Sequence, residues 1–156
     1  MNSYRAPRWL PGGHLQTLYA ALLVPRPEVA YRRERWNTPD GDFIDLDWAD
    51  LPSAVGRQSS PQERSLVVLF HGLEGSSRSH YALALMAELN RRGVRGVVVH
   101  FRGCSGELNR LPRAYHSGDA QEIDWILRRL RAQNSSAPLF AMGVSLGGNA
   151  DRKSVV

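Results

Sequence analysis

Gly143-Val144-Ser145-Leu146-Gly147 directly follows a short apolar stretch, Leu139-Phe140-Ala141-Met142. A Gly-x-Ser-x-Gly run at the end of a buried strand is typical of a nucleophile elbow, where a serine on a tight strand-to-helix turn needs small neighbours. Glycine-rich turns are common, so the pentapeptide gains its weight from the apolar strand before it. The pattern indicates an α/β protein in which Ser145 is the catalytic nucleophile of a serine hydrolase.

The chain does not contain the partners that such a serine needs. A serine hydroxyl becomes a good nucleophile beside a base that is oriented by an acid, and both follow the serine in proteins with this elbow. All five histidines precede Ser145, and Asp151 is the only acid after it, too near to reach around a base. We therefore expect an N-terminal fragment of an enzyme that is inactive by itself.

The length and the last six residues agree with this interpretation. A complete hydrolase sheet with its helices takes about 200–250 residues or more, whereas the chain has 156. Residues 151–156, Asp-Arg-Lys-Ser-Val-Val, break the apolar pattern expected behind the elbow and contain the only lysine. A widely used sequencing-library adapter encodes this hexapeptide, so we expect a non-native tail there. A natural short C-terminus is the alternative.

Composition and charge narrow the class of protein. The chain is 42% hydrophobic and 22% charged, as in soluble globular proteins. Its 20 basic residues, against 15 acidic ones, are scattered, which argues against a nucleic-acid partner. The N-terminal residues do not resemble a signal peptide, and their longest apolar run is too short to span a bilayer. A single cysteine, Cys104, excludes cysteine-pair metal sites. We expect a cytoplasmic protein without a metal or cofactor.

Hydrophobic periodicity predicts the order of the elements. An arm over residues 1–25 lies over the domain, and two alternating runs around Thr38-Pro39-Asp40-Gly41 form a hairpin. A surface loop follows over residues 51–64. Strands and helices then alternate, with strands at 66–70, 94–101 and 138–142 and helices at 79–92 and 120–130. Residues 26–150 therefore predict an incomplete α/β domain with a mostly parallel sheet and helices on both faces.

Candidate site residues follow the ends of the predicted strands, where ligands bind in such sheets. The segment His71-Gly-Leu-Glu-Gly-Ser-Ser77 can direct a backbone N–H at a developing oxyanion. We assign the two oxyanion donors to the N–H groups of Leu73 and Leu146, with an ordinary strand-to-helix turn as the alternative. Three further residues are candidates for the pocket: His14, His71 and Arg102. For Arg102 we expect structural support through a carboxylate, and His14 could instead pin the arm.

Six motifs in order resemble those of one family, the YheT-type alpha/beta-hydrolases. The resemblance runs from about residue 7 to Ala150. The motifs are Pro11-Gly-Gly-His-Leu-Gln-Thr17, Thr38-Pro-Asp-Gly41, His71-Gly-Leu-Glu-Gly-Ser-Ser77, Phe101-Arg-Gly-Cys-Ser-Gly106, Tyr115-His-Ser-Gly118 and Gly143-Val-Ser-Leu-Gly-Gly-Asn149.

The resemblance implies an alpha/beta-hydrolase fold and a carboxylic-ester hydrolase that acts on short- or medium-chain acyl esters or monoacylglycerols. Ser145 matches the family nucleophile, and the family's acid and histidine would lie beyond Ala150. An alcohol acyltransferase or a non-catalytic binding protein on the same fold are the alternatives. Acyl chain length, the alcohol and the oligomeric state are not determined by these motifs.

Overall fold

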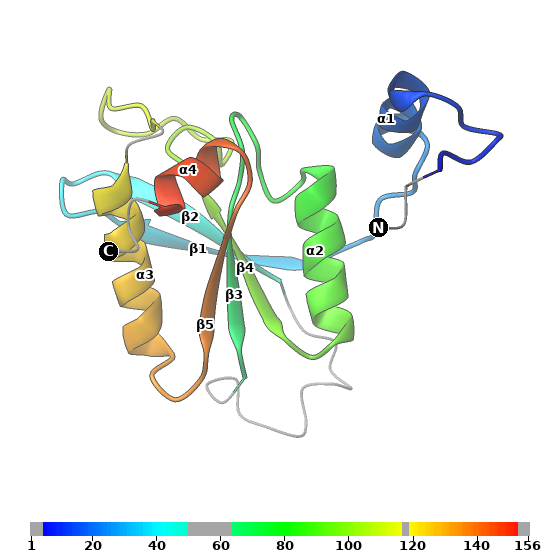
Figure 1. Cartoon of the computed structure of the whole chain (residues 1–156). Helices are drawn as coiled ribbons and strands as arrows, with labels where there is room; N and C mark the ends of the chain where they lie inside the picture. The colour runs from blue at the N-terminus through cyan, green and yellow to red at the C-terminus, as the bar shows by residue number, and fades with distance from the viewer. Residues whose placement is uncertain (1–4, 50–63, 117–118, 153–156) are drawn as a thin grey trace.

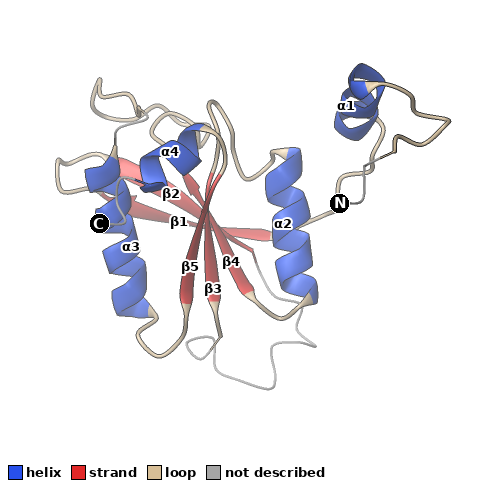
Figure 2. Cartoon of the chain, viewed as in Figure 1, coloured by secondary structure: helices blue, strands red, loops and turns tan. Residues whose placement is uncertain are grey.

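The computed structural model describes residues 5–49, 64–116 and 119–152. The predicted loop falls almost entirely outside these ranges, as do the last four residues of the predicted tail. Figures 1 and 2 show the arrangement of the described elements. In chain order they are α1 (Gly13–Leu22), β1 (Tyr31–Asn37), β2 (Phe43–Ala49), β3 (Leu66–Phe70), α2 (His80–Arg91), β4 (Arg95–His100), α3 (Ala120–Gln133), β5 (Leu139–Gly143) and α4 (Leu146–Arg152).

The five described strands form one sheet in the order β1-β2-β4-β3-β5. β3 pairs in parallel with β4 on one side and with β5 on the other. The hairpin β1-β2 joins this parallel part because β2 pairs antiparallel with β4. The predicted α/β sheet with an N-terminal hairpin is therefore confirmed, and its parallel part consists of the three strands that alternate with helices.

Helices cover both faces of the sheet, as predicted. Side chains alternate along each strand, so neighbouring valines of β4 point to opposite faces. Val97 and Val99 pack in the cluster that contains Ile126 of α3, whereas Val98 packs with Met86 of α2. The parallel strands β3 and β4 are thus buried on both sides, which explains their continuous apolar sequences.

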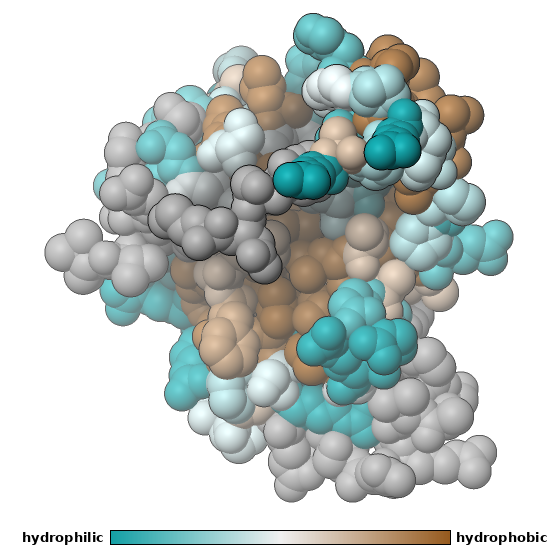
Figure 3. All heavy atoms as spheres, turned by 45° about the vertical axis from the view of Figure 1, so that its right-hand side comes forward, coloured by the Kyte–Doolittle hydropathy of each residue, from teal (hydrophilic) through white to brown (hydrophobic). Residues whose placement is uncertain are grey.

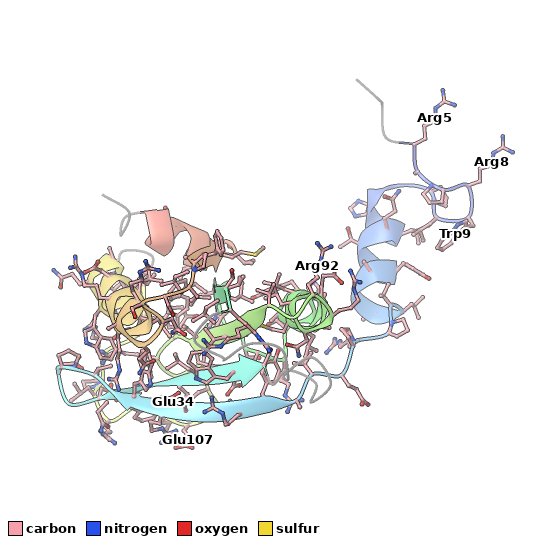
Figure 4. The ribbon with its side chains drawn as sticks, turned by 90° about the horizontal axis from the view of Figure 1, so that it is seen from below. Arg5, Arg8, Trp9, Glu34, Arg92 and Glu107 are labelled. Carbon is pink, nitrogen blue, oxygen red and sulfur yellow. The ribbon has the colours of Figure 1, made fainter. Side chains whose placement is uncertain are left out.

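The N-terminal arm differs from the prediction. It does not lie over the domain: α1 stands to one side of the sheet, with its leucines largely exposed (Figure 1). In Figure 4, Arg5, Arg8 and Trp9 lie at the far end of the arm and point away from the sheet. The arm instead contacts itself, because the ring of Trp9 packs edge-on against Tyr19 at 5.1 Å.

Arg102 forms a buried charge cluster that joins the hairpin to α3. Its Nη1 donates to Asp42 Oδ2 at 3.0 Å, and its Nε donates to Glu122 Oε1 at 2.9 Å. Burial alone would raise the pKa of Asp42, but hydrogen bonds, the largest from the Asn109 side chain, lower it. Removing one member of such a cluster leaves another charge buried without a partner.

His71 joins the carboxyl ends of β3 and β4 as a neutral ring. It is fully buried, its Nδ1 lies 2.7 Å from the carbonyl oxygen of Gly72, and its Nε2 lies 3.1 Å from the backbone N–H of Phe101. A carbonyl only accepts and an N–H only donates, so Nδ1 carries the proton and Nε2 accepts. Burial lowers the pKa of His71 to about 4.

We expect aggregation along β5, which is the end strand of the described sheet. Phe140 and Met142 are 55% and 45% exposed, and an apolar end strand is a template for pairing between chains. The chain expressed by itself should be mostly insoluble or molten. Phe140→Lys should increase the soluble fraction in a sedimentation assay, because a charge at a strand edge opposes pairing. Leu108→Lys, at a loop position that is 92% exposed, is the control. A soluble wild-type chain with a sharp melt would contradict the prediction.

We also expect stability to fall in mild acid because of His71. Its pKa drops from 6.5 in the unfolded chain to about 4 in the folded one, so below pH 6.5 the unfolded chain binds the extra proton. The contribution is complete above pH 6.5 and is lost as the pH falls to 4, about 3 kcal/mol in all. Urea unfolding in the Phe140→Lys background should show this loss, and His71→Gln should reduce it. An unchanged pH dependence in His71→Gln would disprove the assignment.

Candidate active site

Ser145 occupies the turn between β5 and α4 in a strained backbone conformation. Its φ is 53°, a left-handed value that residues other than glycine rarely adopt. The backbone N–H of Val144 donates to Phe70 O at 3.0 Å, so the turn is fixed to the end of β3. The Ser145 side chain is exposed at the carboxyl ends of the parallel strands. A hydroxyl held in this way is accessible to a ligand from outside the sheet.

Glycines around Ser145 are required because backbone segments approach each other closely there. A Cβ at Gly147 would lie 2.4 Å from Phe70 O, and a Cβ at Gly143 would lie 2.4 Å from the Cα of Gly148. Both neighbours are backbone atoms, which cannot turn aside as the end of a side chain could. The Gly-x-Ser-x-Gly-Gly spacing thus lets the first turn of α4 pack directly against β3 and β5.

The loop after β3 lies beside this turn and is held by two tyrosines. A Cβ at Gly72 would lie 3.5 Å from Ser145 Cβ. The backbone N–H of Gly72 donates to the Tyr81 hydroxyl at 3.0 Å, and that of Glu74 donates to the Tyr115 hydroxyl at 2.8 Å. Glu74 also has a positive φ, 52°. The loop is therefore fixed from α2 on one side and from the segment before α3 on the other.

A cavity of about 450 Å³ is lined by residues of both the loop after β3 and the turn at Ser145. Its lining consists of Arg26, Gly72, Leu73, Glu74, Gly75, Arg78, Ser79, His80, Tyr81, Val144 and Ser145. Two of the predicted site residues, Leu73 and Ser145, are therefore brought together. The side chain of Leu146 packs toward the core on the α3 side, while its backbone N–H directly follows Ser145. Within the described residues, no acceptor is hydrogen-bonded to the N–H of Leu73 or Leu146.

The three other predicted pocket residues lie elsewhere. His14 is exposed at the start of α1 and does not border the cavity, because the arm extends to the side. His71 is buried and uses both ring nitrogens between β3 and β4. Arg102 borders a smaller cavity near Trp125, and its expected pairing with a carboxylate is observed. Polar residues at strand ends can point inward as readily as outward, and the pattern does not distinguish the two.

Four residues of the cavity were not identified from the sequence. Arg78, His80 and Tyr81 belong to the loop before α2 or to its first turn, and Arg26 lies between the arm and β1. The sequence could have indicated the three residues near α2, because the first residues of a helix that follows a buried strand lie at the carboxyl edge of the sheet. The ring of His80 packs edge-on against that of Tyr81 at 5.4 Å.

The described residues do not complete a catalytic triad around the serine. Among them, no histidine or carboxylate is hydrogen-bonded to the Ser145 hydroxyl. The same residues contain no group of three histidines, cysteines or acids that could hold a metal ion. Nor is any helix within the described ranges long and apolar enough to cross a bilayer.

Comparison with known proteins finds a matching family and several similar proteins. Residues 65–150 match the family described as alpha/beta hydrolase fold. The chain is 45% identical over 136 residues to "Putative esterase YheT" of Escherichia coli (strain K12), covering 87% of this chain and 38% of that protein. It is 32% identical over 147 residues to "Phospholipase ABHD3" of Homo sapiens, covering 94% of this chain and 36% of that protein. The chain thus spans less than two fifths of the length of these relatives.

Solved structures agree on the fold. XC6422 from Xanthomonas campestris, described as an a/b serine hydrolase without lid, superposes with a TM-score of 0.62 at 19% identity, over 84% of this chain and 58% of that one. Since the family match covers more than half of the 156 residues, the chain belongs to the alpha/beta hydrolase family, among relatives of the YheT type.

Proposed function

We propose that this chain is the nucleophile-bearing part of a serine carboxylic-ester hydrolase that acts on short- or medium-chain acyl esters or monoacylglycerols. Ser145 would be the nucleophile, and the backbone N–H groups of Leu73 and Leu146 would form the oxyanion hole. The positive φ of Ser145, next to the loop at Gly72, carries this proposal. The single cysteine, which cannot form an internal disulfide, is compatible with the cytoplasmic location that we propose.

The geometry supports these roles in two ways. Ser145 sits where parallel strands end, on a turn whose strain is maintained by the packing of Gly147 against Phe70. The loop that carries Leu73 is fixed by Tyr81 and Tyr115, so its N–H direction is set before a substrate binds. Preorganised donors of this kind stabilise the charge that develops in the transition state.

The molecule also has an apolar hollow on its surface. Figure 3 shows hydrophobic side chains gathered in a hollow, surrounded by hydrophilic ones, on the face that appears when the side with α1 turns forward. Ligand sites combine an apolar wall with a few polar groups, which suits an ester with an alkyl chain.

The reaction follows from the chemistry of the serine. Ser145 Oγ adds to the ester carbonyl carbon while its proton passes to a base, and the carbonyl oxygen becomes an anion between the two N–H groups. Collapse of this intermediate breaks the ester bond and releases the alcohol with a proton. Water then cleaves the acyl-enzyme to the free acid. We place the base and its orienting acid outside these 156 residues, so the chain by itself would lack esterase activity.

Ser145→Ala should abolish activity in the extended protein, meaning this chain continued to the length of its relatives. Loss of a triad member lowers turnover by about 10⁴–10⁶-fold. The extended protein should react with a fluorophosphonate probe and hydrolyse a medium-chain nitrophenyl ester, whereas the 156-residue chain should label only at background. Replacing Leu73 should cost less, because its backbone N–H survives the substitution.

Ser105→Ala serves as the control for this experiment and should label like wild type. Thermal melts of all variants separate a chemical effect from a folding defect. Full esterase activity in the Ser145→Ala protein would reject the nucleophile assignment, and Cys104 would then need testing.

Gly147→Ala should disrupt the turn, although it adds only one methyl group. Its Cβ would meet Phe70 O at 2.4 Å, so the start of α4 must move away from β3. We expect strongly reduced probe labelling of the extended protein together with a lower melting temperature. Gly13→Ala is the matched control, because a Cβ there has open space within 4 Å. Equal labelling of both variants would show that the close packing is dispensable.

A further inference from the structure

Two arginines border the cavity that contains Ser145. Arg26 lies between α1 and β1, and Arg78 lies in the loop before α2; both side chains are exposed. The same two arginines also border a neighbouring cavity of about 570 Å³ that is lined by Glu28 and Leu83 among others. They come from distant parts of the sequence, so only the fold brings them to one site.

These two arginines differ from those that the fold uses in ion pairs. Arg33, Arg35, Arg102 and Arg113 each form an ion pair with a carboxylate. In the part of the chain that the structure describes, neither Arg26 nor Arg78 has an acidic side chain within ion-pair distance. An arginine beside a catalytic cavity without an internal partner is available to an anionic ligand, for which its planar fork of N–H donors is suited.

The acidic residue of the Ser145 cavity does not cancel its positive charge. Glu74 is the one acidic residue in the lining of that cavity, against two arginines, and Glu28 borders the neighbouring cavity. Burial raises the pKa of Cys104 and of Tyr115, and the negative charge of Glu74 raises both further. With two arginines and one glutamate, the lining of the Ser145 cavity keeps an excess of positive charge.

We propose that Arg26 and Arg78 bind a negatively charged group on the ester substrate. The site would then select acyl esters whose alcohol part carries an oxyanion, either a phosphate or a carboxylate, over neutral esters of the same acyl chain. This inference rests on the proposed function, because it assumes that the ester carbonyl lies at Ser145. Pairing with a charged group fixes the orientation of the substrate as well as its affinity.

The test compares esters that share one acyl chain in the extended protein. The three substrates are 1-hexanoylglycerol, 1-hexanoylglycerol 3-phosphate and the hexanoyl ester of glyceric acid. We expect kcat/KM for an anionic ester to exceed that for the neutral ester by about tenfold to a hundredfold, as for hydrogen bonds to charged groups. The preferred anion identifies the group, and the preference should weaken as salt is added.

Arg26→Gln combined with Arg78→Gln should remove this preference by raising KM for the anionic esters. Arg5→Gln combined with Arg8→Gln removes the same two charges from exposed positions at the far end of the arm and should keep the preference (Figure 4). Equal kcat/KM for neutral and anionic esters in wild type, or a preference that survives in the double variant, would overturn the inference.

A binding experiment separates this inference from the proposed function. Hexyl phosphate is titrated into the extended protein carrying Ser145→Ala, with 1-hexanol as the neutral comparison. Binding that is lost when Arg26 and Arg78 are replaced, but kept when Arg5 and Arg8 are replaced, supports the anion site even if no ester is hydrolysed. Absent binding, or equal binding by these two double variants, counts against the anion site, whereas ester hydrolysis that persists in Ser145→Ala rejects the nucleophile alone.

Discussion

The site depends on how closely the first turn of α4 approaches the ends of β3 and β5. Gly147 lies against the carbonyl of Phe70, and Gly143 lies against Gly148, at distances that leave no room for a Cβ. This contact forces Ser145 into a left-handed conformation, since the chain must reverse from strand to helix within one residue. A Cβ at either glycine would push the helix away and would change this turn.

A layer of buried polar groups extends the same rigidity to the hairpin. Asp47 of β2 accepts hydrogen bonds from Ser77 Oγ at 2.6 Å and from Arg33, and its Oδ2 lies 2.8 Å from His100 Nε2. Burial by itself would raise the pKa of Asp47, but Arg33 and the other partners hold it far below its usual value. The hairpin therefore fixes the loop after β3, and the antiparallel strands support the candidate site although they contribute none of the residues around Ser145.

Hydrophobic periodicity was sufficient for the strands, for α2 and α3 and for their order, but it did not predict α1. The strands around Val68 and Val98 are apolar because both of their faces are covered, and α3 shows a helical repeat because one face is. The pattern did not predict the position of the arm, whose apolar residues could equally have packed on the sheet. It also assigned His14 and His71 to the pocket, because the residues around a histidine do not show whether its side chain lines a cavity. His14 is exposed on the arm, and His71 is buried between β3 and β4.

What the sequence by itself determined is local. The spacing of glycines around Ser145 specifies the tight turn through the excluded volume of a Cβ, which acts within a few residues and can be recognised without a structure. Only the tertiary structure decided which distant groups meet: Arg102 with Asp42 and Glu122, sixty and twenty residues away, and Arg26 with Arg78 beside one cavity. These contacts depend on strand order and loop direction. Charged side chains interact strongly only at short distances, and residues far apart in the sequence reach such distances only when the chain folds.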